Sequence, residues 1–314
     1  MKQQVLLRLL SYGSTILLVI AGFSLWYVWQ WEYAPAYLEV DFLSLNRGHG
    51  IFIRLPNKHI VLVDGGQSGD IIRELSRLMP FYRRTIDSVL MTDAQPKSVG
   101  GLIDVIKRYS VLHLYMPDGM GTTTASEAVL GLAREKSIPV TELSVGDRVN
   151  LFSEVLATGN EHLNEKQLAN KSVAVNVLFP DQNFPFSKAS PAQLVLNLLF
   201  GKTEMIFAGD ASRAIQNYLA KGIAATSSSL LKDLKSPINI LEYDHSGGAS
   251  NVSQKFIEAL DPKFIIVKSS GKVSKATTLK KPQFNARSYV SQIRDLSSSS
   301  AQFFSDGERI WKGK

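Results

Sequence analysis

The sequence has no cysteine among its 314 residues. Disulfide bonds and thiolate chemistry are therefore excluded, and the folded part of the chain must depend on its hydrophobic core. Two other signatures are also missing, the serine nucleophile elbow and the lysine-containing phosphate-binding loop. These absences exclude thiol enzymes, and they leave no local motif for a serine hydrolase or a P-loop nucleotide-binding protein.

Acidic residues are in the minority, with 28 Asp and Glu against 35 Lys and Arg and a formal net charge of +7. Residues 262–294 contain no acid, and their basic residues are Lys263, Lys268, Lys272, Lys275, Lys280, Lys281, Arg287 and Arg294. Such a tract can follow a phosphate backbone, with Lys272, Lys275, Lys280 and Lys281 as candidate anion-binding residues. The alternative is a solvated surface loop, because few aromatic side chains for base stacking lie among these residues.

Charge is also absent from residues 12–31, which are mostly apolar. About 20 such residues in a helix cover the hydrocarbon core of a bilayer. Aromatic residues crowd the C-terminal end, as in an interfacial belt: Trp26, Tyr27, Trp29, Trp31 and Tyr33. Lys2 and Arg8 precede the segment, which predicts a single-pass anchor in the cytoplasmic membrane, residues 1–11 inside and the soluble part outside. A signal peptide cleaved near residues 34–36 is the alternative.

Short β-rich runs and helical patterns alternate after residue 36. Strands are expected at 37–45, 50–56, 59–66, 88–93, 113–117, 147–158, 174–179, 193–200, 203–209, 238–244 and 264–268. Helices are expected at 69–79, 99–109, 124–135, 211–221 and 253–260. Polar segments at 159–172, 181–191 and 269–284 are predicted loops. The pattern predicts an α/β domain over 37–314, with two mixed sheets packed face to face and helices outside them.

Several segments carry a specific resemblance through their order and spacing. They read LEVDFLSLNRGHGIFIRLPNKHIVLVDGG (38–66), SVLMTDAQPKSVGGLIDVIKRY (88–109), LVLNLLFGKTEMIFAGD (194–210), INILEYDHSGGAS (238–250) and AQFFSDGERIWKG (301–313). Together they resemble the metallo-β-lactamase domain at the C-terminal end of ComEC-type DNA-uptake proteins. The resemblance implies a four-layer αββα sandwich, the metallo-β-lactamase fold.

The metal motif of that family, T-H-x-D-x-D-H-x-G-G, is altered at every ligand position. Asp93 stands at the first His, Gln95 and Lys97 at the two Asp, and Ser98 at the second His. Two-metal hydrolases need converging imidazoles and carboxylates to activate a bridging water. A lysine in that place opposes a divalent cation directly. The motif therefore predicts a site without metal.

Other positions of the resemblance are retained or changed singly. Asp64, Asp210 and His245 match the family, whereas Asp244 replaces a histidine. Ser44 and His49 stand where the family carries acids. The resemblance thus gathers Asp64, Asp93, Asp210 and Asp244 in one place, and Lys97 is expected to neutralise part of their charge. This is the hypothesis that a lysine substitutes for zinc.

Structural roles compete with these assignments. Asp64 with its two glycines is typical of a strand-ending turn, Asp210 of a helix cap, and His245 of a hydrogen-bonded strand end. Gly100-Gly101 either present backbone N–H groups to an anion or permit close packing. The spacing of His49, His59, His113 and His162 indicates no ligand role for any of them.

Three functions remain open from the sequence. The first is a non-catalytic, membrane-anchored relative of the ComEC-type domain that binds DNA, another polyanion or a membrane channel protein. The second is an atypical phosphodiesterase-like hydrolase with zinc or manganese at Asp64, Asp93, Asp210 and His245. The third is a structural envelope scaffold. Because function resides in a site rather than in a fold, the fold alone does not choose among them.

Overall fold

The computed structural model describes residues 2–32, 37–153, 172–184, 192–225, 234, 237–245, 253–269, 292–295 and 300–313. The chain divides into a first unit that ends at Ala36 and a second unit, Tyr37–Lys314. The described part of the first unit is one helix, α1 (Lys2–Glu32). In the described part of the chain no helix has the length and apolar character needed to cross a membrane. The transmembrane span expected over residues 12–31 is therefore unsupported.

The first sheet of the second unit has eight strands. Their order is β17 (Ile310–Lys312), β16 (Ala301–Ser305), β1 (Leu38–Phe42), β2 (Ile51–Arg54), β3 (Ile60–Val63), β5 (Ser88–Leu90), β7 (Leu114–Pro117) and β8 (Val140–Leu143). Strands from β17 to β3 pair antiparallel, whereas β3, β5, β7 and β8 pair in parallel. The sheet is therefore mixed, as the sequence predicts.

The second sheet has seven strands and is also mixed. Their order is β15 (Gln292–Asp295), β14 (Phe264–Ser269), β13 (Ile240–His245), β12 (Thr203–Phe207), β11 (Val195–Phe200), β10 (Ser172–Phe179) and β9 (Arg148–Ser153). The pairs from β12 to β15 are parallel and those from β9 to β12 antiparallel. A separate pair joins β4 (Thr85–Ile86) to β6 (Ser110–Val111).

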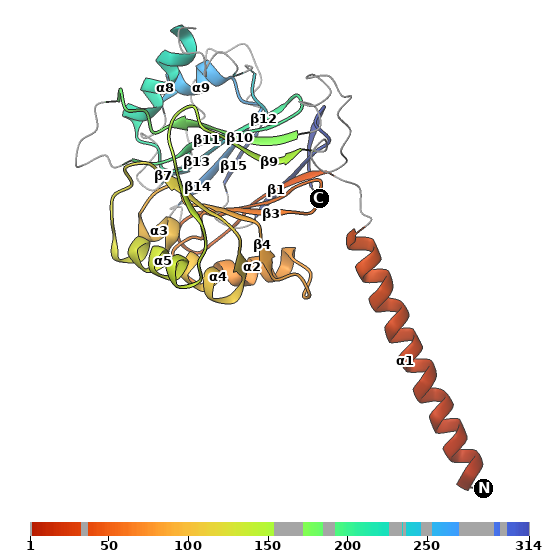
Figure 1. Ribbon diagram of the computed structural model, residues 1–314. Coiled ribbons are helices and arrows are strands. Elements are labelled where there is room, and N and C mark those ends of the chain that lie inside the picture. Colours follow the sequence, from red (N-terminus) through yellow and green to blue (C-terminus); the bar gives the residue numbers. More distant parts are fainter. Residues whose placement is uncertain are drawn as a thin grey trace, which may run out of the picture. The chain divides into compact units, whose positions relative to one another are not determined.

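Helices cover the outer face of each sheet (Figure 1). Those on the first sheet are α2 (Asp70–Leu78), α3 (Pro96–Val99), α4 (Leu102–Arg108) and α5 (Thr124–Glu135). Those on the second are α8 (Arg213–Ala225) and α9 (Gln254–Leu260).

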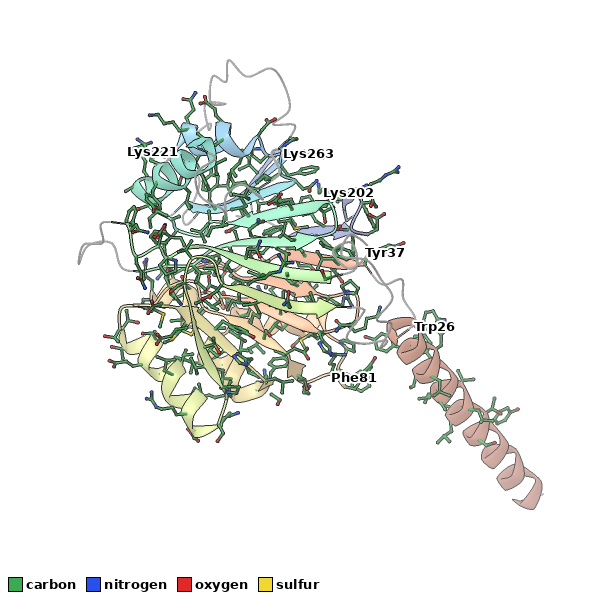
Figure 2. All side chains as sticks on the ribbon, turned by 45° about the horizontal axis from the view of Figure 1, so that its top comes forward. Trp26, Tyr37, Phe81, Lys202, Lys221 and Lys263 are labelled. Atoms are coloured by element: carbon green, nitrogen blue, oxygen red, sulfur yellow. The ribbon has the colours of Figure 1, made fainter. Side chains whose placement is uncertain are left out.

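Three apolar cores separate the four layers. One lies between the sheets and contains Phe42 and Phe207, whose rings meet edge to face with centroids 6.0 Å apart. A second lies under α2, α4 and α5, and a third under α8 and α9. Figure 2 shows side chains filling the space between these layers. Three interlayer cores define a four-layer αββα sandwich, which confirms the architecture expected from the sequence.

Some elements differ from the expectation. The helix predicted over 99–109 begins later, at Leu102, and Val99 instead ends α3. Gly100 and Gly101 lie between these two helices and pack tightly against neighbouring backbone: a Cβ there would lie 2.4 and 2.0 Å from the oxygens of Gln67 and Gly65. The helix predicted over 211–221 begins later, at Arg213. Strands β8 and β15 were not expected. The predicted loops, and Lys272, Lys275, Lys280 and Lys281, lie wholly or mainly outside the described residues.

Candidate functional site

The candidate site lies at one edge of the two sheets. Asp64 follows the end of β3, Thr92 and Asp93 follow β5, and Asp210 follows β12. The turn at Asp64 is tight: its φ of 58° is unusual for a residue with a side chain, and its N–H donates to Leu90 O at 2.9 Å. Strand ends thus bring residues that are distant in sequence to one place.

Asp64 is fully buried, yet three donors surround its carboxylate. Thr92 donates its backbone N–H to Oδ1 at 2.8 Å and its hydroxyl to Oδ2 at 2.5 Å. Nε2 of buried His49 lies 2.7 Å from Oδ2. With its proton on Nε2, the His49 ring donates to this carboxylate oxygen. These three bonds satisfy the buried charge without a metal ion.

Lys97 forms the second pair of the site. Its Nζ lies 2.6 Å from Oδ2 of Asp210, and both side chains are about one-fifth exposed. The backbone at Lys97 lies directly against Gly48, which has a φ of 79° and no side chain. A Cβ at Gly48 would lie 1.7 Å from the Lys97 carbonyl oxygen, so only glycine leaves room for Lys97 in this position. A Cβ at Gly209 would lie 3.7 Å from His49 Nε2, which puts the two pairs next to each other.

Asp93 is the third carboxylate and is 3% exposed. Its Oδ1 accepts a hydrogen bond from the N–H of Gln95 at 2.7 Å. Burial, reinforced by the charge of Asp64, raises the pKa of Asp93 to about 6, while His49, the Gln95 N–H and the Ser98 hydroxyl act in the opposite direction. Asp93 is therefore ionised at neutral pH at a cost to the fold.

A pH-dependent stability follows for Asp93→Asn. The pKa of Asp93 is 3.8 in the unfolded chain and about 6 in the folded chain. The contribution of this group to the free energy of unfolding is therefore fully present below pH 3.8 and is lost as pH rises through about 6. The native chain should lose up to about 3 kcal/mol through this group, which the asparagine variant avoids. Urea unfolding should therefore show a gain in stability for D93N at pH 7.5 and a gain about one-third as large near pH 4.5. A pH-independent difference would contradict this account.

The structure brings most of the predicted site residues together. Asp64, Asp93, Lys97 and Asp210 lie at the same edge, and buried Ser98 accepts the Gly65 N–H at its carbonyl oxygen, 2.7 Å away. Three other predicted residues are placed by their backbone. Gln95 starts α3, and Asp244 and His245 end β13, where the structure describes their backbone and not their side chains.

The contacts of Gly100-Gly101 and of Asp210 test the structural roles that the sequence left open for them. The N–H groups of Gly100 and Gly101 donate to Pro96 O and Gly66 O, so close packing explains these glycines. The capping role for Asp210 is wrong, because α8 begins at Arg213 and the side chain of Ser212 accepts the Ile215 N–H at 3.4 Å. Asp210 instead accepts from Lys97.

Sequence reasoning missed three residues of the site. His49 was assigned no role, although its place in the altered first turn was a signal. Thr92 is the retained first residue of the altered motif, and its two donors complete the Asp64 environment. Glu242, an acid within an apolar strand, is 3% exposed and accepts the Gly209 N–H at 3.2 Å. An acid at a buried strand position was the available signal for this contact.

The described residues do not fit the two-metal centre of the family. They contain no group of three or more His, Cys, Asp or Glu side chains arranged to hold a metal ion. The oxygens of Asp64 are bound by protein donors, and Oδ2 of Asp210 faces an ammonium group. An ammonium in that place repels a divalent cation.

Comparison with known proteins supports the resemblance found in the sequence. No family model matches the chain. ComE operon protein 3 from Bacillus subtilis (strain 168) is 24% identical over 251 residues, which cover 74% of this chain and 28% of that protein. The chain therefore spans little more than a quarter of the curated relative that it matches. This match confirms the resemblance to the ComEC-type domain.

Solved structures also align with the chain. The diiron β-hydroxylase CmlA from Streptomyces venezuelae is 15% identical, with a TM-score of 0.46, and the alignment covers 74% of this chain and 45% of CmlA. Igni18, a metallo hydrolase from Ignicoccus hospitalis KIN4/I, is 10% identical, with a TM-score of 0.42 and coverage of 73% and 82%. The four-layer architecture rests on the sheet order and the three cores rather than on these likenesses.

Proposed function

We propose that this chain is a non-catalytic relative of the ComEC-type metallo-β-lactamase domain that acts by binding DNA in connection with competence. One observation carries the proposal: Lys97 Nζ lies 2.6 Å from Asp210 Oδ2, within the group of residues that corresponds to the metal site of the family. The lysine supplies a positive charge where the related hydrolases hold a metal.

The size of the repulsion supports a metal-free site. Two positive charges on a divalent ion about 4 Å from an ammonium group repel it by about 8 kcal/mol at an effective dielectric constant of about 20. Structural zinc sites bind with apparent free energies of about 10–16 kcal/mol. Lys97 thus removes half or more of the affinity that such a site would have, before the loss of Asp210 as a ligand is counted.

DNA is the partner that the charge of the chain favours. The net charge is +7, and the chain resembles the domain found in ComEC-type DNA-uptake proteins, a resemblance that ComE operon protein 3 supports. Polyanion binding through counterion release depends steeply on salt. The test is fluorescence anisotropy of a labelled oligonucleotide with the purified chain between 50 and 200 mM salt, about the range where such contacts weaken. Salt-dependent binding supports the proposal, and no binding at the lowest salt contradicts it.

A metal-dependent hydrolase is the second candidate, and one observation favours it. Asp93 lies in the site with a pKa raised to about 6, and strongly shifted carboxyl groups occur often at active sites. Incubating the same chain with a labelled oligonucleotide and added zinc or manganese separates the two functions. We expect intact DNA, whereas metal-dependent cleavage that is lost in Asp93→Asn, a variant expected to stay folded, would establish the hydrolase.

Association with a membrane through α1 belongs to the same proposal. Apolar side chains of this helix are exposed to more than three-fifths of their surface, among them Leu17, Leu18, Phe23 and Leu25. Exposed apolar surface of this extent favours lipid or a partner protein over water. Flotation of the full chain with lipid vesicles, compared with a chain that starts at Tyr37, tests this. Flotation of both or of neither would contradict it.

A further inference from the structure

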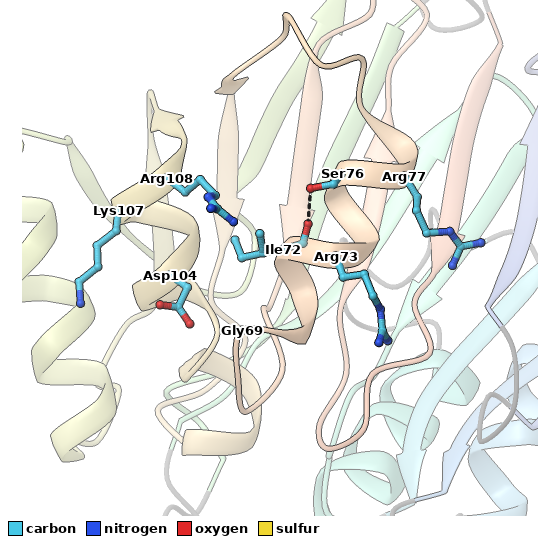
Figure 3. A pocket seen from close by; sticks show the side chains of 8 residues that line it. All are labelled: Gly69, Ile72, Arg73, Ser76, Arg77, Asp104, Lys107 and Arg108. Carbon is cyan, nitrogen blue, oxygen red and sulfur yellow. Dashed lines mark hydrogen bonds between the residues drawn. The ribbon is translucent and has the colours of Figure 1, made fainter.

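A basic groove lies on the outer face of the helices that cover the first sheet (Figure 3). It is a pocket of about 890 Å³ between α2 and α4. Four basic residues line it: Arg73 and Arg77 from α2, and Lys107 and Arg108 from α4. Asp104 is the only acid among its lining residues. This groove is separate from the Lys97–Asp210 pair and is assigned no role by the fold or by the site.

Helix periodicity explains why these residues share a groove. In α2, the buried side contains Ile71, Glu74 and Leu75, so Arg73 and Arg77, four residues apart, lie one above the other on the outer side. In α4, buried Leu102, Val105 and Ile106 leave Lys107 and Arg108 exposed in the last turn. Figure 3 shows Arg108 extending from α4 toward Ile72 of α2.

Glu74 holds the two arginines of α2 in position. It is 5% exposed, and its carboxylate accepts from Nε of Arg73 at 3.4 Å and from Nη1 of Arg77 at 2.9 Å. The arginine side chains themselves are 66% and 71% exposed. A guanidinium group has five N–H donors, and these bonds use one nitrogen of each. Most of the surface of both arginine side chains is exposed, and the four basic residues outnumber Glu74 and Asp104.

We propose that this groove binds the phosphate backbone of DNA. The inference rests on the proposed function and names the surface through which that function acts. Guanidinium groups recognise phosphate through paired N–H donors, and fixed arginines lose less entropy on binding than mobile ones do. None of the groove's lining residues is aromatic, so the contact contains no base stacking. Contacts to phosphate carry no sequence information, so this part of the binding does not distinguish one base sequence from another.

The test compares two double variants that remove the same charge. The first is K107Q with R108Q, in the groove. The control is K221Q with K255Q, two exposed lysines on α8 and α9, which cover the other sheet (Lys221 is labelled in Figure 2). At about 0.1 M salt the groove variant should bind the oligonucleotide at least about tenfold more weakly than the native chain does. Its plot of log affinity against log salt should also be less steep, with the magnitude of the negative slope smaller by about 1.5–2. The control should change affinity less than about threefold.

Each further outcome decides between the groove and its rivals. Equal losses in both double variants would overturn the groove, because net charge alone would then explain binding. A larger loss in K272Q with K275Q, K280Q and K281Q, with none in the groove variant, would place the DNA on that tract and overturn the groove. Failure of the native chain to bind DNA would refute the proposed function itself. Retention on anionic lipid vesicles without DNA binding would do the same. Thermal melting checks that every variant is folded.

Discussion

Replacing Asp64 with asparagine is expected to destabilise the second unit by about 3 kcal/mol. The Asp64 side chain is fully buried and accepts from the Thr92 N–H, the Thr92 hydroxyl and His49 Nε2. The asparagine amide carries an NH2 group where Asp64 has a second oxygen. This NH2 group is itself a donor, so it cannot accept the hydrogen bonds from Thr92 and His49, and these buried donors lose their partner. Such losses cost about 1–3 kcal/mol for each neutral group and about 3–5 kcal/mol when a buried ion pair is broken. Urea unfolding of the purified chain measures the difference.

The matched control is Asp118→Asn. Asp118 is partly exposed, and the Ser144 hydroxyl donates to its carboxylate at 3.1 Å. This variant makes the same change of carboxylate to amide at a position where water can replace a lost hydrogen bond. We expect a loss below about 1 kcal/mol. Similar values for the two variants would show that the Asp64 network contributes little to stability. The role assigned to His49 and Thr92 would then be wrong.

The second large effect is a gain of metal binding in Lys97→Asp combined with Ser98→His. These changes remove the cation and restore the carboxylate and imidazole of the family motif, beside Asp64, Asp93 and Asp210. Without metal, the new carboxylate faces Asp210 and the variant should be less stable than the native chain. With zinc at about 100 times its dissociation constant, stability should rise by about 2.7 kcal/mol. Thermal melting with and without zinc measures this shift.

The control for the restored site is Lys97→Gln combined with Ser98→Gln. It removes the same cation without supplying charged or imidazole ligands, so zinc should not stabilise it. A folded K97D/S98H variant that is insensitive to zinc would contradict the view that Lys97 is what prevents metal binding. If that variant fails to fold even with zinc while K97Q/S98Q folds, the opposed carboxylates are the cause. Failure of both would show that the Lys97–Asp210 pair is structural.

Much of the fold could be predicted because alternating short strands and helices leave few ways to bury apolar faces. Phe42, Phe207 and Ile240 belong to predicted strands and meet in the core between the sheets. Strands β8 and β15 were missed for a physical reason. β8 has three exposed residues in four, and β15 pairs along one edge with β14, so neither carries a strong apolar pattern.

The candidate site was predictable in its residues and less so in its contacts. The spacing of the altered motif indicated that Lys97 lies among carboxylates, and the structure pairs it with Asp210. Nothing in the spacing indicated which carboxylate it would choose, because that depends on how closely Gly48 and Gly209 let the loops approach. His49 was missed because its partner Asp64 is held by a turn with a positive φ, which local sequence does not specify.

The basic groove illustrates a different limit. Arg73 and Arg77 are recognisable in sequence as neighbours on one helix, and so are Lys107 and Arg108. The two pairs line one groove because their helices pack side by side over one sheet, and this arrangement is known only from the tertiary structure. The sequence instead drew attention to the tract around Lys272–Lys281, because there the charge is continuous along the chain. A basic cluster whose residues come from separate helices cannot be found from charge along the sequence.

The metal content of the native protein tests the central claim most directly. The full chain, purified without chelators and dialysed against buffer with micromolar zinc and manganese, is analysed by inductively coupled plasma mass spectrometry. With the Lys97 ammonium against Asp210, the protein should carry far less than one equivalent of either metal. One or more tightly held equivalents in a chain that still contains Lys97 would contradict the account.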